Sequence, residues 1–353
     1  DLSGVISIAS GWYHNLALKS DGTVVTWGWN GYDLQSIPIG LDNVVAIAAE
    51  GEHSLALRSD GTLVSWGYTG NDISTLPLIS NELTFSIICD TDGNLYDCSG
   101  ICGGNLEYDD CNFCGGPSSE YLCECDENLN CSLECSEETN CLGLCGEISE
   151  EVCLAQSNSN LIASGAYHSL ALQADKTLVG WGRNYEGEST IPDGLTGVVD
   201  MAGGRHHAVS LKSDGTVDAW GWNPYGQTVV PQELENIVSV SAGYYHSLAL
   251  KSDGTIVGWG LNDVGQTDTP ADLNDVISIT GGDHISVALK RDGTVVKWGS
   301  NEYGLMERLN DIVDYEGVIT SIELKYRYIL ALTDNGTLIE MGRDQGVPVG
   351  LNN

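Results

Sequence analysis

The sequence has few basic residues. Its 14 Lys and Arg stand against 50 Asp and Glu, which gives a formal net charge of −36. A surface this acidic repels the phosphates of nucleic acids and of anionic lipids. No apolar run approaches the roughly 18 residues that a membrane-spanning helix requires. We therefore expect neither nucleic-acid binding nor insertion into a membrane.

Catalytic motifs are also missing from the sequence. It contains no nucleophile elbow, no phosphate-binding loop and no His-Glu-x-x-His motif. Several carboxylates recur in Asp-Gly pairs, such as Asp21-Gly22 and Asp60-Gly61. These pairs are typical of tight turns, because glycine accepts the positive φ that such turns demand. We therefore predict a protein that is not an enzyme and that requires no cofactor.

Long helical patterns are absent, and a short β unit recurs instead. The apolar runs have a period of two and are rich in Val, Ile, Thr and Trp, and 44 glycines punctuate them. Each pair of runs encloses a turn and ends at Trp-Gly or its counterpart. The seven copies of this position are Trp27, Trp66, Trp181, Trp220, Trp259, Trp298 and Met341.

The spacing of these copies predicts how the units are arranged. Trp27 and Trp66 are 39 residues apart, and the same interval separates each of the four copies from Trp181 to Trp298. A unit of this length has room for three strands and a return linker. Residues 347–353 repeat the linker at residues 37–43, so the strand that should follow them is the one at the N-terminus. The sequence therefore predicts an all-β fold, a closed seven-bladed β-propeller with three-stranded blades of about 39 residues.

One stretch interrupts the repeats between blades 2 and 3. We expect blades 1 and 2 in residues 1–82, an acidic insertion in residues 83–158, and blades 3 to 7 in residues 159–353, which close onto the N-terminus. A polar segment this rich in cysteine predicts disulfides and an oxidising compartment, so a secreted or cell-surface protein. The predicted disulfide residues are Cys89, Cys98, Cys102, Cys111, Cys114, Cys123, Cys125, Cys131, Cys135, Cys141, Cys145 and Cys153.

Metal binding by the insertion is an open alternative or addition to the disulfides. Asp90, Asp92, Asn94 and Asp97 offer oxygens at short spacing, which makes calcium a candidate ligand, although the full EF-hand pattern is missing. Zinc is a weaker alternative, because the insertion contains no histidine.

Five repeats place a histidine at the start of the second strand: His14, His53, His168, His207 and His246. A ring of metal-binding histidines is one interpretation. Ile285 and Tyr328 occupy the position in the other two repeats, so we favour a structural role, a hydrogen bond to a neighbouring loop.

The loop before this histidine and the loop after Trp-Gly should lie on one face of the propeller, and they vary while the turns do not. Aromatic residues and histidines collect there, as they do in protein interfaces. The predicted partner-binding residues are Trp12, Tyr13, Trp29, Tyr32, Tyr167, Tyr185, His206, Trp222, Tyr225, Tyr244, Tyr245, His284 and Tyr303.

The segment from Gly243 to Asn262, followed by Gly265-Gln266 and Pro270, resembles the repeat of the regulator of chromosome condensation family. The short period and the linker from Gln227 to Pro231 are similar to those of the bacterial secreted propellers that inhibit β-lactamases. That resemblance implies a grip on the target by Trp12, Tyr13, Tyr167, Tyr225, Tyr244, Tyr245 and Tyr303. Glu52, His206 and His284 depart from its aromatic pattern.

We therefore expect a secreted or cell-surface propeller that binds a protein partner through an aromatic face. One alternative is a structural module that assembles with other copies in an extracellular structure. Another is an inhibitor of a secreted hydrolase such as a β-lactamase. Nucleotide exchange on a small GTPase, which the first resemblance implies, is disfavoured by the acidity.

Overall fold

The computed structural model describes residues 4–68, 161–173, 175–232, 234–271, 273–300, 318–325 and 328–341, together with residues 70 and 76. It also describes the backbone of four short strands, which form two antiparallel pairs: β7 (Ser86–Ile88) with β8 (Leu95–Asp97), and β9 (Cys123–Cys125) with β10 (Cys131–Leu133). The disulfide and calcium predictions rest on side chains outside this part. The domain boundaries stay predictions.

Seven antiparallel three-stranded sheets follow one another along the chain, each in the order of its sequence. This confirms the prediction of seven three-stranded units, and we call the sheets blades 1 to 7. Their strands are β1 (Val5–Ser10), β2 (His14–Lys19) and β3 (Val24–Gly28); β4 (Val44–Glu50), β5 (His53–Arg58) and β6 (Leu63–Gly67); β11 (Ile162–Ser164), β12 (His168–Leu172) and β13 (Leu178–Gly182); β14 (Val198–Gly203), β15 (His207–Lys212) and β16 (Val217–Gly221); β17 (Ile237–Ala242), β18 (His246–Lys251) and β19 (Ile256–Gly260); β20 (Val276–Gly281), β21 (Ile285–Lys290) and β22 (Val295–Gly299); and β23 (Ile319–Lys325), β24 (Tyr328–Thr333) and β25 (Leu338–Met341).

The turn between the second and third strands is built by its own side chains. In blade 1, Asp21 Oδ1 accepts hydrogen bonds from Thr23 N at 3.0 Å and from Thr23 Oγ1 at 2.6 Å. Gly22 has a φ of 75°, in the left-handed region that glycine tolerates. The Thr23 hydroxyl lowers the pKa of Asp21. The recurring Asp-Gly carboxylates are therefore turn formers, as predicted.

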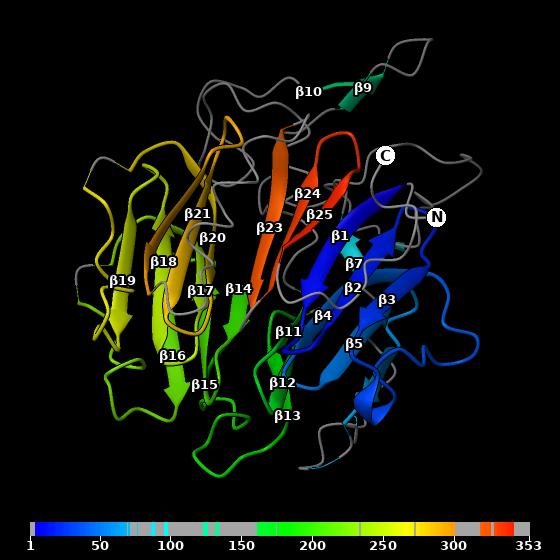
Figure 1. Ribbon diagram of the computed structural model, residues 1–353, viewed down its shortest axis with the longest axis horizontal. Coiled ribbons are helices and arrows are strands. Elements are labelled where there is room, and N and C mark those ends of the chain that lie inside the picture. Colours follow the sequence, from blue (N-terminus) through cyan, green and yellow to red (C-terminus); the bar gives the residue numbers. More distant parts are fainter. Residues whose placement is uncertain are drawn as a thin grey trace.

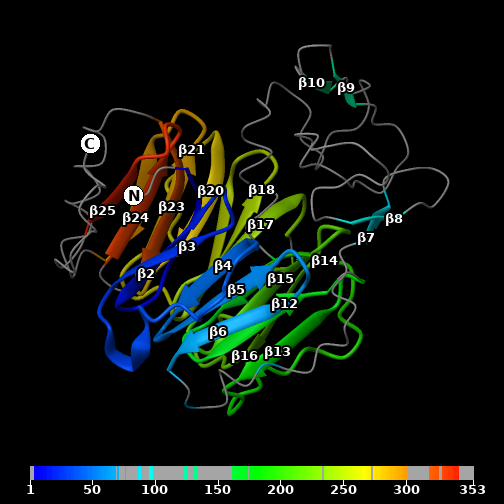
Figure 2. The same ribbon diagram turned by 90° about the vertical axis from the view of Figure 1, so that its right-hand side faces the viewer.

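Alternation of large and small residues packs each blade against the next. In β2, Leu16 and Leu18 lie in one core cluster with Ala56 and Trp66 of blade 2. Ala17, on the opposite face, lies in another cluster with Trp27 and with residues of blade 7. Successive strand residues point to opposite faces of a sheet, so a Leu pair on one blade meets an Ala and a Trp on its neighbour. Figures 1 and 2 show the sheets following one another around a common axis.

Blade 7 packs against blade 1. β1 contacts β23 and β24, and Figures 1 and 2 place the red strands beside the blue ones. Glu340 of β25 links the two blades, because its Oε1 accepts from Asn15 Nδ2 and its Oε2 from Trp27 Nε1, both at 2.9 Å. In blades 2, 4 and 5 the corresponding tryptophan donates to a linker carbonyl, as Trp66 does to Leu34 O at 3.0 Å. The arrangement is consistent with a seven-bladed propeller.

The recurring histidines connect neighbouring blades. The ring nitrogen Nε2 bonds a serine hydroxyl on the next blade in four pairs: His14 with Ser54 at 2.8 Å, His53 with Ser169 at 3.0 Å, His207 with Ser247 at 3.0 Å and His246 with Ser286 at 2.9 Å. The serine lies in a strand, so the predicted structural role holds but the predicted loop partner was wrong. In the described residues no group of three or more His, Cys, Asp or Glu side chains could hold a metal ion.

Burial keeps four of the recurring histidines neutral. It lowers the pKa of His14, His53, His168 and His207 to about 3. Both ring nitrogens of His168 lack a partner within the described chain, because Ala208 stands where four other blades place serine. Separately, no helix in the described residues is long and apolar enough to cross a membrane.

Candidate partner-binding face

Two loop positions that are separated in sequence are joined in blades 1 to 6. The residue after the third strand donates its N–H to the carbonyl of the residue before the second strand, as in Trp29 N to Tyr13 O at 2.7 Å and Trp222 N to His206 O at 2.8 Å. The loops also bond from blade to blade, as in Trp12 N to Gly51 O at 2.8 Å. The predicted partner-binding residues that the structure describes therefore lie on one face.

Their rings form one connected network. Ring-to-ring contacts, with centroids 5.1–6.4 Å apart, run through blades 1 to 6. Most are edge-to-face, the geometry that aromatic quadrupoles favour. We call the following set the aromatic face: Trp12, Tyr13, Trp29, Tyr32, Tyr68, Tyr167, His206, Trp222, Tyr225, Tyr244, Tyr245 and His284.

Two arginines lie among the rings of blades 3 to 5. Arg183 lies 5.6 Å from the ring centre of Tyr167 and 5.0 Å from that of Tyr185. Its Nε is 3.1 Å from the buried carboxylate of Glu188. Arg205 lies 5.1 Å from the ring centre of Tyr244, and its Nη1 donates to Tyr245 Oη at 2.6 Å. These cations hold the rings in place through their π faces.

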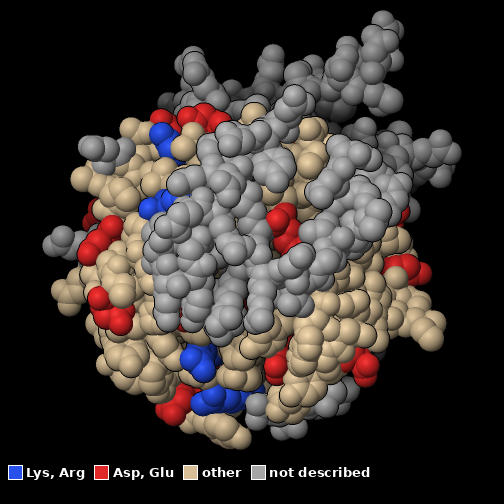
Figure 3. Space-filling model, viewed as in Figure 1, with Lys and Arg blue, Asp and Glu red and all other residues tan. Residues whose placement is uncertain are grey.

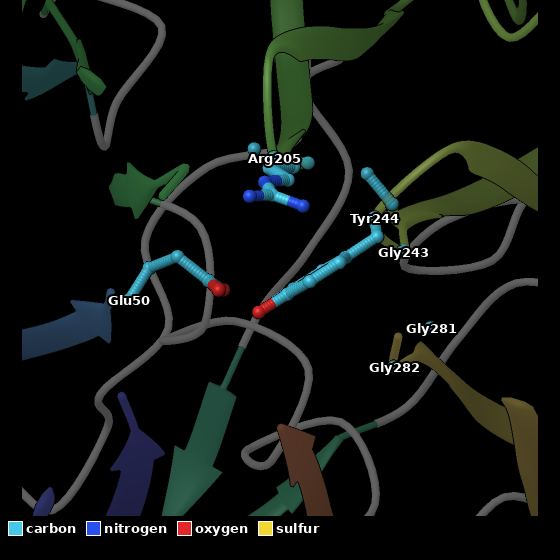
Figure 4. Close-up of a pocket in the computed structure, with 9 residues that line it drawn as sticks. Glu50, Arg205, Gly243, Tyr244, Gly281 and Gly282 are labelled. Atoms are coloured by element: carbon cyan, nitrogen blue, oxygen red, sulfur yellow. The ribbon is translucent and has the colours of Figure 1, made fainter. Parts of the chain in front are cut away.

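Side chains from non-adjacent blades meet at the centre of the aromatic face and close it. Trp12 of blade 1 contacts Tyr167 of blade 3 at 5.5 Å and Tyr244 of blade 5 at 6.1 Å, measured between ring centres. A small hollow remains beside them, lined by Glu50, Arg205, Tyr244 and glycines of blades 4 to 6. Figure 4 shows the Glu50 carboxylate and the Tyr244 hydroxyl pointing toward each other, with the Arg205 guanidinium directed into the same space.

The glycines around this hollow are needed by the packing of the blades. A Cβ on Gly243 would lie 2.5 Å from the carbonyl oxygen of Gly282, and a Cβ on Gly203 would lie 2.6 Å from the carbonyl of Ser164. Real Cβ atoms do not approach backbone this closely, so these positions bring neighbouring loops together. We therefore assign the hollow to the architecture of the ring.

The predicted residues differ in how far they face solvent. Tyr185 is 77% exposed, Tyr32 51%, Tyr225 47% and Trp29 42%, whereas Tyr244 is only 8% exposed. Tyr244 therefore contributes to the closed centre of the face. Most of the others are half-buried. Tyr303 lies outside the described residues.

Sequence reasoning left four contributors out of the predicted set. Tyr68, Arg183 and Arg205 occupy the same two loop positions as the predicted aromatics, so position alone could have included them. Glu50 is the last residue of β4, and no sequence pattern points to it.

Charge on the molecule is predominantly acidic. Figure 3 shows acidic side chains spread over the described surface, with basic ones in a few places. On the aromatic face, burial is the main cause that lowers the pKa of His206 to about 4, and Arg183 and Arg205 add to it. Burial raises the pKa of Glu52.

Comparison with known proteins now identifies the repeat. Residues 5–33, 161–188, 198–227 and 237–266 match the regulator of chromosome condensation (RCC1) repeat. The chain is an RCC1-like repeat propeller. This confirms the family resemblance found in the sequence. No curated protein matches the RCC1-like chain significantly.

Solved structures share the fold of this RCC1-like propeller at low sequence identity. Prp20p of Saccharomyces cerevisiae is similar with a TM-score of 0.58 and 17% identity, over 94% of this chain and 83% of that protein. The CRINKLY WD40 ectodomain of the Arabidopsis thaliana receptor kinase ACR4 has a TM-score of 0.58 and 14% identity, over 98% of both chains. The ectodomain of the Physcomitrella patens receptor kinase CR4 has a TM-score of 0.60 and 13% identity, over 97% of this chain and 74% of that one.

Proposed function

We propose that this propeller is a non-catalytic protein-binding module whose aromatic face contacts a partner protein. The observation that carries the proposal is the connected set of rings from six blades, several of them 40% or more exposed, on a scaffold whose opposite turns are uniform. Rigid aromatic rings supply large contact area with little loss of side-chain entropy, and they dominate interface hot spots.

The structural neighbours support a binding role without identifying the partner. The structure of Prp20p was described with its binding properties toward Gsp1p and histones, and yeast RCC1 was also solved bound to Kap60. Those partners are properties of those proteins. Inhibition of a secreted hydrolase and assembly with other copies of the chain remain alternatives.

The test compares two single substitutions on the aromatic face with one on the opposite face. Tyr13→Ala and Tyr225→Ala remove one ring each, and Lys212→Ala removes a half-buried side chain that is paired with Asp218 near the turns. Partner capture from the native source is quantified by mass spectrometry for all three and for the unaltered protein.

We expect at least one aromatic substitution to reduce capture of the same partner by about tenfold to thirtyfold, the loss typical of a hot-spot residue. Lys212→Ala should capture as much as the unaltered protein. Thermal unfolding checks that all variants remain folded. A partner that ignores every substitution on the aromatic face would refute the proposal.

A secreted or cell-surface location and disulfides in the insertion belong to the same proposal, and the cysteine density supports both. Mass spectrometry of native material after alkylation, with and without prior reduction, tests the disulfides. The mass should increase only after reduction. Twelve freely alkylated cysteines without reduction would refute them.

A further inference from the structure

Arg205 carries its positive charge at the centre of the aromatic face without a negative partner. Its loop joins β14 to β15, and its side chain is half-buried. Among the described residues no carboxylate forms an ion pair with it. Arg183, by contrast, pairs with the buried carboxylate of Glu188. In a chain with a formal net charge of −36, a cation that no acid neutralises needs an explanation.

Two acidic residues of blade 2 lie near the centre of the face, and neither is paired with Arg205. Figure 4 shows the Glu50 carboxylate directed toward the Tyr244 hydroxyl, and Glu50 forms no ion pair with Arg205. Glu52 acts on a different hydroxyl: burial raises the pKa of Tyr167 most, and the charge of Glu52 adds to it. The charge of Arg205 is therefore not matched by direct contact with either carboxylate.

Aromatic rings hold the Arg205 guanidinium in place. Its Cζ lies 6.0 Å from the ring centre of Trp12, 5.1 Å from that of Tyr244 and 5.7 Å from that of Tyr245. These contacts stabilise the cation through the π faces but supply no negative charge. Nη1 also donates to Tyr245 Oη at 2.6 Å. A ligand would therefore meet a guanidinium that is already fixed, so that little side-chain entropy is lost on binding.

Two tyrosine hydroxyls add donors beside Arg205. Tyr245 Oη accepts a hydrogen from Arg205, so its own proton is left to donate, and the described residues offer that proton no acceptor. Arg205 opposes the effect of burial on the pKa of Tyr167, so the guanidinium acts on that hydroxyl as well. The Tyr167 proton has no described acceptor either. A positive charge surrounded by N–H and O–H donors is the environment that an oxyanion requires.

The surroundings of Arg205 select one class of oxyanion. A single positive charge matches a monoanion, and the acidic surface of the chain repels polyanions. The Nε atom of Arg205 is buried without a hydrogen-bond partner, so a ligand can reach only the Nη atoms. Apolar surface adjoins these donors, because the rings of Trp222 and Tyr225 lie 5.3 Å and 5.5 Å from that of Tyr245. A carboxylate beside an apolar group fits both the charge and the rings.

We propose that Arg205, with the hydroxyls of Tyr245 and Tyr167, binds a carboxylate of the partner protein, an Asp or Glu side chain that stands beside an apolar residue. One carboxylate oxygen accepts from Arg205 Nη, and the other accepts from the Tyr245 hydroxyl. This inference rests on the proposed function, and it assigns a chemistry to the part of the partner that meets the centre of the aromatic face.

Sodium benzoate is the probe, because it joins a carboxylate to an apolar ring, and benzamide is its uncharged counterpart. NMR spectra of the full chain labelled with ¹⁵N-arginine follow the guanidinium signals during titration at constant ionic strength, and Arg205→Lys assigns the Arg205 signal. Arg183 is the internal control, because its guanidinium already pairs with Glu188. Tyr245→Phe removes only a hydroxyl, and Glu52→Gln removes a negative charge that acts on Tyr167.

We expect the Arg205 signal to shift saturably with benzoate and to stay in place with benzamide, while the Arg183 signal responds to neither. Tyr245→Phe should weaken benzoate binding about threefold to tenfold, as expected for one net hydrogen bond. Glu52→Gln should strengthen it about twofold, because a repulsive charge is removed. Opposite effects of the two variants separate the site from general loss of structure. An unmoved Arg205 signal, equal responses to both probes, or tighter binding of sulfate than of benzoate would overturn the inference.

Capture of the native partner separates failure of this inference from failure of the proposed function. Arg205→Lys should reduce capture about tenfold, the loss typical of a hot-spot residue. If Tyr225→Ala lowers capture but Arg205→Lys and Tyr245→Phe do not, the aromatic face binds the partner and the carboxylate assignment is wrong. If capture ignores all three substitutions, the proposed function is wrong, and the partner's carboxylate is refuted with it even where benzoate binds.

Discussion

One junction between blades lacks a hydrogen bond that four others have. His168 of blade 3 faces Ala208 of blade 4, and both nitrogens of its ring are buried without a partner in the described residues. At the junction of blades 4 and 5, His207 Nε2 lies 3.0 Å from Ser247 Oγ, which in turn donates to Gln227 O at 2.9 Å. We predict that Ala208→Ser supplies the missing hydroxyl and stabilises the fold.

The magnitude follows from the equivalent junction. Ala208 pairs with Trp220 as Ser247 pairs with Trp259, so a serine at 208 would have the same strand register. Its hydroxyl would donate to Glu188 O, which already accepts from Trp220 Nε1 at 3.1 Å, and would accept from His168. One net hydrogen bond and relief of an unpaired buried nitrogen together give about 1–2 kcal/mol.

Urea unfolding at pH 7 measures this gain, and Ser247→Ala is the matched control because it deletes the equivalent bond. We expect the free energy of unfolding to rise by about 1–2 kcal/mol for Ala208→Ser and to fall by a similar amount for Ser247→Ala. The melting temperature should rise by about 2–4 °C per kcal/mol. If Ala208→Ser is neutral or destabilising while Ser247→Ala is costly, position 208 has no room for the hydroxyl. If neither changes stability, the histidine–serine bonds do not support the ring.

Three further changes have defined outcomes. Burial raises the pKa of Asp200 to about 7 from 3.8, so between these two pH values the folded state binds a proton that the unfolded state releases. The free energy of unfolding should therefore fall from pH 4 to 7 by up to about 1.4 kcal/mol per pH unit. Urea unfolding of Asp200→Ser should show that this dependence on pH is lost. Glu340→Ala should lower the free energy of unfolding by about 2–4 kcal/mol, because Trp27 and Asn15 lose their shared acceptor. An unchanged free energy of unfolding would show that Glu340 does not hold blades 7 and 1 together. Gly31→Ala should displace the Trp29 ring and shift its fluorescence with little loss of stability, and an unshifted spectrum would contradict the contact.

The repeat predicted the blades well because the same physical demands recur in each. The Asp-Gly turn, the alternation of leucine and alanine, and the constant interval between tryptophans each follow from local backbone chemistry and from packing against an identical neighbour. The number of strands in each blade and the shared face of the two variable loops could therefore be predicted from one copy of the repeat.

The arrangement of the aromatic face could not be predicted to the same degree. Tyr244 and Tyr245 are adjacent in sequence, yet the first is buried against Trp12 from across the ring and the second bonds Arg205. Such contacts depend on the closure of the ring, which no single repeat contains. The left-handed backbone conformation of Tyr32, with a φ of 56°, could not be predicted either. Tyrosine ordinarily avoids this region, so its presence in the linker gives no signal of a positive φ.

Every sheet in this ring consists of three strands that are consecutive in sequence, so the junction between blades 7 and 1 shares no backbone ladder. Side chains such as Glu340 make the connection there. A gene encoding this architecture can consequently gain or lose a complete unit by duplication or deletion without cutting through any sheet.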